Sequence, residues 1–190
     1  GLACAPADGA QWHAVAEQLR QRGGTPRLLV CVIDAADAPT TGTPDAWRAA
    51  LDGSVHAAVA ATQAIVPLMV AGGAIVLTAS SLAISDTQVD AAALTVASAG
   101  LVAFTRVLAL AVAAQQITVN CVAYDVAQVE QGARTSAAAL ARIPAGQPAT
   151  AADIAGTVAF YASADAAYLT GSTLIVDGGQ SLQSWSNAPA

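Results

Sequence analysis

The chain has 190 residues, enough for one domain, and 55% of them are hydrophobic while 11% are charged, so it is too apolar to be intrinsically disordered. It carries 50 alanines and seven arginines against 13 acidic residues, and the net charge of −6 argues against a nucleic-acid or anionic-membrane partner bound through a basic patch. It contains no lysine, which excludes Schiff-base chemistry and any ammonium that anchors a nucleotide.

Short β-branched runs alternate with long alanine-rich stretches, a pattern typical of a parallel sheet with crossover helices. Continuous apolar runs without a polar face predict fully buried strands at residues 28–33, 74–77, 117–123 and 173–176. Helices are predicted over residues 9–22, 44–70, 89–115 and 151–163. The predicted fold class is α/β: one domain over residues 1–190, with an incomplete doubly wound parallel sheet of about four to five strands and helices on both faces.

Three local signals refine this organisation. Pro44 followed by Asp45 is a favourable helix start, and Gly72-Gly73 predicts the end of that helix. The polar, glycine-containing segment 125–148 follows the carboxyl end of a strand, where ligands bind in parallel sheets. We therefore expect this segment to be a lid-like insertion over a crevice.

The cysteines indicate a reducing, cytoplasmic compartment, because Cys4, Cys31 and Cys121 are odd in number and form no CxxC pair. Cys31 and Cys121 lie in apolar strands and are predicted to be core side chains. His13 and His56 have no partners at the spacing of a metal site or a catalytic triad, so no metal ligands are predicted.

No membrane association is predicted. The stretch 89–114 carries only Asp90 and Arg106 as charges, but alanine dominates it and threonine and serine interrupt it. No basic segment followed by an apolar run opens the sequence, so no signal peptide is expected.

Three motifs resemble the short-chain dehydrogenase/reductase superfamily. They are SAGLVAFTR at 98–106, ITVNCVA at 117–123, and the run from 153 to 179 that ends in VDGG. The resemblance implies a Rossmann-like fold and a nicotinamide-dependent oxidoreductase ancestry. It begins partway into the family fold, so the chain is expected to be an N-terminally truncated member.

The family's chemistry uses a serine, a tyrosine thirteen residues later as acid/base, and a lysine four residues after that. Ser81 matches the serine, but Leu94 stands at the tyrosine position and Ser98 at the lysine position. Leucine has no proton to exchange, and a serine hydroxyl supplies no positive charge. Ser81 is therefore predicted to be vestigial, with no catalytic residue left in this chain.

Other family features are also altered. Ser54 stands where the resemblance implies an asparagine that holds a water of the proton relay, residues 33–36 replace Asn-Asn-Ala-Gly, and Tyr124-Asp125 replaces Pro-Gly. Gly23-Gly24 lies before a strand and Gly178-Gly179 follows the last strand, so neither is a glycine loop that opens a helix and holds a pyrophosphate. No cofactor-binding residue is predicted in this chain.

The helix predicted at 89–115 is apolar all round and therefore needs cover on both sides. In the family this helix and the preceding one pair with a second subunit. The interface residues expected from the resemblance are Ala99, Val102, Phe104, Val107 and Leu108.

These features predict a degenerate, non-catalytic subunit, similar to the inactive subunits of heteromeric dehydrogenases such as that of anaerobic toluene degradation. It would form a heterodimer or heterotetramer with an intact paralogue, which would bind NAD(P) and oxidise an alcohol such as a CoA-linked hydroxy acid, while this chain binds no cofactor. One alternative is a small-molecule-binding regulatory homodimer without redox activity. Another is an enzyme of altered chemistry that uses Ser81 or Tyr124.

Overall fold

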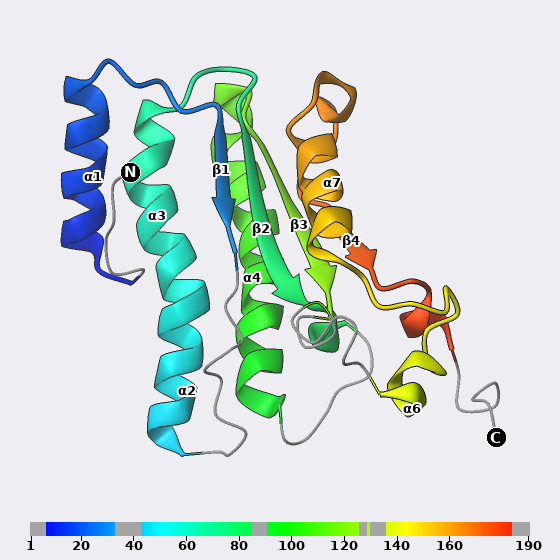
Figure 1. The fold of residues 1–190 in the computed structure, drawn as a ribbon. Helices are drawn as coiled ribbons and strands as arrows, with labels where there is room; N and C mark the ends of the chain where they lie inside the picture. The colour runs from blue at the N-terminus through cyan, green and yellow to red at the C-terminus, as the bar shows by residue number, and fades with distance from the viewer. Residues whose placement is uncertain (1–6, 33–42, 85–90, 126–128, 130–135, 184–190) are drawn as a thin grey trace.

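Four parallel strands form the centre of the structure, a computed structural model that describes residues 7–32, 43–84, 91–125, 129 and 136–183 (Figure 1). In sheet order they are β1 (Leu28–Cys31), β2 (Ala74–Ser80), β3 (Thr118–Tyr124) and β4 (Thr173–Val176). Each pair of neighbours runs parallel, with Leu77 opposite Cys121 in the β2–β3 register. The structure confirms the predicted α/β class, and every predicted strand is present.

Burial differs between the central and the outer strands. Every residue of β2 is buried, and so is all of β3 except Thr118. Leu28 is exposed, however, and the rest of β1 is only half-buried. In β4, Leu174 is exposed and the other residues are half-buried. The prediction of fully buried strands is therefore wrong at 28–33 and at 173–176, because within the described residues each of these strands has a neighbour on one side only.

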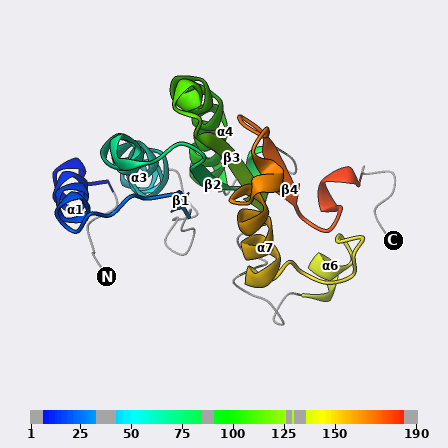
Figure 2. The same ribbon diagram turned by 90° about the horizontal axis from the view of Figure 1, so that it is seen from above.

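Helices cover both faces of the sheet, as predicted (Figure 2). One face is covered by α3 (Ala57–Ile65) and α4 (Ala92–Val112), and the other by α7 (Ala151–Tyr161). The first helix, α1 (Gly9–Gln21), packs against α3 through a small apolar cluster centred on Ala16, Ala64 and Ile65. The main core lies between α4, α7 and the central strands.

The predicted helix at 44–70 is present but contains an irregular turn. Thr43 caps it by accepting a hydrogen bond from the Ala46 N–H at 3.2 Å, and α2 (Pro44–Leu51) follows. A π-helical turn, η1 (Asp52–His56), then leads into α3. Such turns insert one extra residue into a helix. After a 3₁₀ turn, η2 (Val66–Leu68), Gly72 adopts a φ of 77° and the chain enters β2.

The helix α4 is the longest described element and one side of it faces the core. Among the described residues, Ala92–Gln115 is the single helical stretch long and apolar enough to cross a membrane by length and composition. It packs instead along β2 and β3, which is the position of a core helix. Its buried residues follow the helical period along one side: Ala93, Ala97, Ser98, Leu101, Thr105, Ala109 and Val112.

Candidate functional site

The candidate site lies at the carboxyl ends of β2 and β3, where the arrowheads point in Figure 1. Parallel pairing brings these two strand ends together, and Ser80 is the register partner of Tyr124. Ser81 begins the 3₁₀ turn η3 (Ser81–Ala83) directly after β2. In open parallel sheets this edge is where ligands bind, so the chemistry-bearing residues lie at the expected place.

Hydrogen bonds fix the strand end that carries Ser81. The Ser80 side chain accepts a hydrogen bond from the Leu82 N–H at 3.3 Å and so caps η3. The Ile84 N–H donates to the Ser81 carbonyl at 2.9 Å. The Ser81 residue itself is buried, with 7% of its surface exposed. Two hydrogen bonds therefore hold the turn that begins at Ser81.

Ser98 lies on α4 and contacts this end of β2. Its Oγ accepts a hydrogen bond from the Ser80 N–H at 3.0 Å, and the residue is fully buried. Leu94, one turn earlier on α4, is half-buried and packs against the main core. At the two positions where the resemblance implies a tyrosine and a lysine, the site thus has an apolar side chain and an uncharged hydroxyl. Sequence reasoning missed the contact with Ser80, which no spacing rule indicates.

Ser54 lies in the π-helical turn η1 and is buried. Its hydroxyl donates to the Ala50 carbonyl of its own helix. A hydroxyl engaged in this way does not replace the side-chain amide of an asparagine, which offers both a donor and an acceptor.

His56 has a partner that the sequence analysis did not identify. Its Nδ1 lies 2.6 Å from the Asp52 carboxylate, four residues earlier, and the His56 and Asp52 side chains are 58% and 45% exposed. Among the described residues, no group of three or more histidine, cysteine, aspartate or glutamate side chains could hold a metal ion. The pair is therefore a surface contact of η1 and not part of the site.

Cys31 and Cys121 were both predicted to be core side chains. Cys121 is buried in the main core, as predicted, whereas Cys31 is half-buried and packs against it. Burial raises the pKa of each thiol to about 12, although hydrogen bonds with Thr105 and Thr173 oppose this rise at Cys121. Because the thiolate is the nucleophilic form, neither side chain is a nucleophile at neutral pH.

The end of the predicted lid is attached to the turn after β4. The short helix α6 (Ala137–Leu140) leads to Ile143, which is buried against Gly178. The Ala145 N–H donates to the Gly178 carbonyl at 3.1 Å. Residues 126–128 and 130–135 of the predicted lid lie outside the described residues, so its closure over the site stays a prediction.

The predicted interface residues divide into two groups on α4. Ala99 and Val107 are exposed, while Val102, Phe104 and Leu108 are half-buried and pack against the main core. The outward side also exposes apolar residues that were not predicted, with Leu110 83% and Val96 49% exposed.

Comparison with known proteins decides the family. Residues 2–181 match the family profile described as Enoyl-(Acyl carrier protein) reductase, which is nearly the whole chain. The chain belongs to the short-chain dehydrogenase/reductase superfamily. This confirms the resemblance seen in the sequence motifs and in the fold.

Two curated relatives of this superfamily member are reductases by name. The 3-oxoacyl-[acyl-carrier-protein] reductase FabG of Escherichia coli K12 is 46% identical over 87 residues, which are 44% of this chain and 36% of FabG. The dehydrogenase/reductase SDR family member 4 of Pongo abelii is 32% identical over 180 residues, 87% of this chain and 63% of that relative. The chain thus matches only about a third of the length of FabG.

A solved structure of the superfamily has a similar fold. It is an NADPH-bound short-chain oxidoreductase of Pseudomonas aeruginosa PAO1, described as containing an atypical catalytic center. The TM-score is 0.82 at 25% identity, and the superposition covers 95% of this chain and 76% of that one.

These relatives contradict the predicted non-catalytic subunit. The matched proteins are reductases and an NADPH-bound oxidoreductase, so the chain groups with redox enzymes and the prediction is wrong. The sequence reasoning equated the loss of a tyrosine and a lysine with the loss of catalysis. The Pseudomonas structure is described as NADPH-bound and as containing an atypical catalytic center, so the two features occur together in that protein.

The superfamily implies a nicotinamide dinucleotide, and the described residues do not fit it in the family's manner. The Ser98 hydroxyl faces the Ser80 N–H and offers no ammonium to a ribose. Tyr124 and Asp125 replace Pro-Gly, and the Tyr124 residue is 6% exposed. Residues 33–36, which replace Asn-Asn-Ala-Gly, lie outside the described residues. The described residues therefore do not by themselves complete the family's dinucleotide site.

Proposed function

We propose that this protein is an oxidoreductase that interconverts a carbonyl and an alcohol through an atypical centre built from Ser81 and Tyr124. The observation that carries the proposal is the register of β2 and β3: Ser80 lies opposite Tyr124 at the carboxyl ends of the two strands, and Ser81 follows Ser80 in the turn η3. The names of the relatives support the reaction class, because FabG is a 3-oxoacyl reductase.

In this centre the Ser81 hydroxyl donates a hydrogen bond to the substrate carbonyl oxygen and orients it. The Tyr124 hydroxyl gives its proton to that oxygen as the oxygen becomes an alkoxide, and the tyrosinate regains a proton from water. In the oxidation direction the same groups work in reverse. A nicotinamide dinucleotide, the reductant used by the superfamily, would supply the hydride and its two electrons. In this proposal Ser81 is a catalytic residue, whereas the sequence analysis predicted it to be vestigial.

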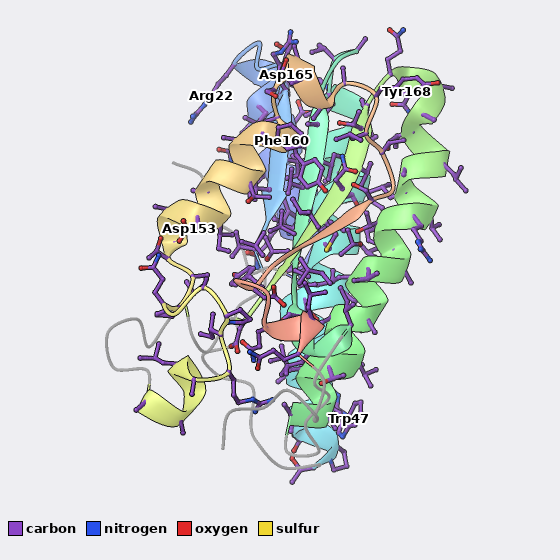
Figure 3. The ribbon with its side chains drawn as sticks, turned by 90° about the vertical axis from the view of Figure 1, so that its right-hand side faces the viewer. Arg22, Trp47, Asp153, Phe160, Asp165 and Tyr168 are labelled. Carbon is purple, nitrogen blue, oxygen red and sulfur yellow. The ribbon has the colours of Figure 1, made fainter. Side chains whose placement is uncertain are left out.

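The reaction is tested with NADPH or NADH and a panel of 3-oxoacyl thioesters and simple ketones, with product formation measured by mass spectrometry. We expect Ser81→Ala and Tyr124→Phe each to lower kcat by about a hundredfold or more. Matched controls remove a hydroxyl elsewhere. The first is Ser163→Ala, because the Ser163 hydroxyl donates to the Phe160 carbonyl. The second is Tyr168→Phe, because Tyr168 is fully exposed and lies near one end of α4, while Trp47 lies near the other end (Figure 3). Absence of turnover in the unaltered protein, or full activity of Tyr124→Phe, contradicts the proposal.

Binding of the dinucleotide by this chain alone is expected to be weak. The chain has no lysine, and at the family's lysine position the Ser98 hydroxyl is already bonded to the Ser80 N–H. Groups outside this chain would then have to complete the cofactor site. Isothermal titration with NADPH and NADH measures this, and micromolar affinity for the isolated chain contradicts the expectation.

We also propose that the outward side of α4 pairs with a second subunit of the same superfamily. Leu110 and Val107 are 83% and 65% exposed, and exposed apolar patches of this kind mark protein contacts. Native mass spectrometry of the purified complex shows whether the partner is a second copy or another chain. Val107→Asp with Leu110→Asp is expected to release monomers, while Gln18→Asp on the exposed side of α1 leaves the assembly intact. A monomeric unaltered protein contradicts the pairing.

A further inference from the structure

We propose that Ser98 is a positioning residue that sets the orientation of Ser81. The inference rests on the proposed function, because it assigns a role within the same site. At the position where the resemblance implies a lysine, this chain would use an uncharged anchor that acts through the neighbouring strand and does not touch the substrate.

The contact itself is a tertiary hydrogen bond. Ser98 Oγ accepts from the Ser80 N–H at 3.0 Å, and the two residues are 18 positions apart, on α4 and at the end of β2. Ser80 and Ser98 are 1% and 0% exposed, so water does not reach the bond. A buried N–H left without an acceptor is costly, and this bond therefore holds the strand end against α4.

The strand end is the part of the molecule that carries Ser81. Ser80 is bonded twice: its N–H reaches Ser98, and its Oγ accepts from the Leu82 N–H. Ser81 lies between these two anchored groups. A displacement of the Ser80 backbone would therefore move the Ser81 hydroxyl, and small displacements of reacting groups have large effects on rate.

Another buried hydroxyl of α4, that of Thr105, offers a contrast. Thr105 is also 0% exposed and faces the sheet, but its Oγ1 donates to the Leu101 carbonyl of its own helix at 2.8 Å. Burial on this side of α4 thus does not by itself direct a hydroxyl to the end of β2. The contact with the Ser80 N–H is specific to the position of Ser98, since Thr105 bonds within its own helix.

Amide hydrogen exchange measured by NMR tests the contact without any substrate. In Ser98→Ala we expect the Ser80 amide to exchange about tenfold faster or more, and the Ser81 side-chain carbon resonance to shift. Thr105→Val is the matched control and should leave both signals unchanged. If Ser98→Ala does not fold, Ser98→Cys, which keeps a weaker acceptor at the same place, is measured instead. Unchanged Ser80 exchange and Ser81 resonances in the folded variant overturn the proposal.

Kinetics of a double-mutant cycle separate positioning from a general structural role. Ser98→Ala should lower kcat about tenfold in the otherwise unaltered protein, with little change in KM, and have no further effect when Ser81 is already alanine. Equal losses in both backgrounds overturn positioning while leaving the proposed function in place. If no substrate turns over at all, the proposed function fails, and the NMR measurement alone decides the role of Ser98.

Discussion

The Oγ of Ser98 and the N–H of Ser80 are joined by a 3.0 Å hydrogen bond that ties α4 to the carboxyl end of β2. The bond lies where the resemblance implies a charged side chain reaching a cofactor. Its presence means that this position is already filled and bonded in the folded protein. A lysine introduced at this position alone is therefore expected to disturb the contact between α4 and β2.

Ser98→Lys is expected to lower the free energy of unfolding by about 3 kcal/mol or more. Ser98 is 0% exposed, and a lysine there would bury an ammonium without a carboxylate partner while removing the acceptor of the Ser80 N–H. Urea unfolding followed by circular dichroism measures the change. Val96→Lys, at a position 49% exposed on the same helix, is the control and should stay within about 0.5 kcal/mol of the unaltered protein. A Ser98→Lys protein as stable as this control would show that the site has room for the family's lysine.

Asn120→Leu is expected to lower the free energy of unfolding by about 2 to 4 kcal/mol. Asn120 is buried in β3, where its Nδ2 donates to the Leu169 carbonyl at 2.8 Å and its Oδ1 accepts from the Ser172 N–H at 3.1 Å. Leucine has a similar size but leaves both backbone groups without a partner. Thermal and urea unfolding measure the change.

Tyr161→Phe is the control for this network, because it removes only the outer bond from the Tyr161 hydroxyl to Ser172 Oγ, at 2.9 Å. It should cost about 1 kcal/mol. Equal losses for Asn120→Leu and Tyr161→Phe would mean that Asn120 does not hold the loop before β4.

Gly178→Ala is expected to destabilise the protein by about 2 to 4 kcal/mol, through backbone strain and a steric clash together. The φ of Gly178 is 62°, and an added Cβ would lie 2.8 Å from Ile143 Cγ2 and 3.0 Å from Ala145 Cβ. Gly146→Ala separates the two causes, because Gly146 has a φ of 74° with no atom within 4 Å of an added Cβ. It should cost about 1 kcal/mol from strain alone. If both variants lose the same stability in urea unfolding, the packing of Ile143 against Gly178 is not a constraint.

Much of the fold could be predicted because it follows from local patterns. The run at 173–176 is β4 with the same bounds, and the other strands were located within a few residues. The strand predicted at 74–77 was too short, since Thr78 and Ser80 are polar and yet buried at the end of β2. The π-helical turn at Asp52–His56 was not predicted either, because nothing in a 3.6-residue apolar pattern marks one extra residue in a turn.

The site was predicted in its positions and not in its interactions. Sequence spacing placed Ser81 and Ser98 at one centre, and the structure confirms that their elements meet there. The bond from the Ser80 N–H depends on how closely α4 approaches β2, which no spacing encodes. The function was mispredicted for a related reason: missing residues show which mechanism is absent, and the relatives, which are reductases by name, contradict the inference that catalysis is absent too.

Thiol ionisation is expected to make stability fall as the pH rises above about 9. Burial raises the pKa of Cys31 and Cys121 to about 12 from an ordinary value of 9.0, so the folded protein keeps both thiol protons between these values while the unfolded chain loses them. The unfolded state then binds fewer protons, and the free energy of unfolding decreases by about 1 kcal/mol per thiol between about pH 9 and pH 10. Urea unfolding at these pH values, in a Cys4→Ser background, measures the decrease. The control is the same protein with Cys31→Ala and Cys121→Ala. Over this interval its free energy of unfolding should decrease by about 2 kcal/mol less than that of the protein with both thiols. Parallel pH curves for the two proteins would show that burial does not hold these thiols protonated.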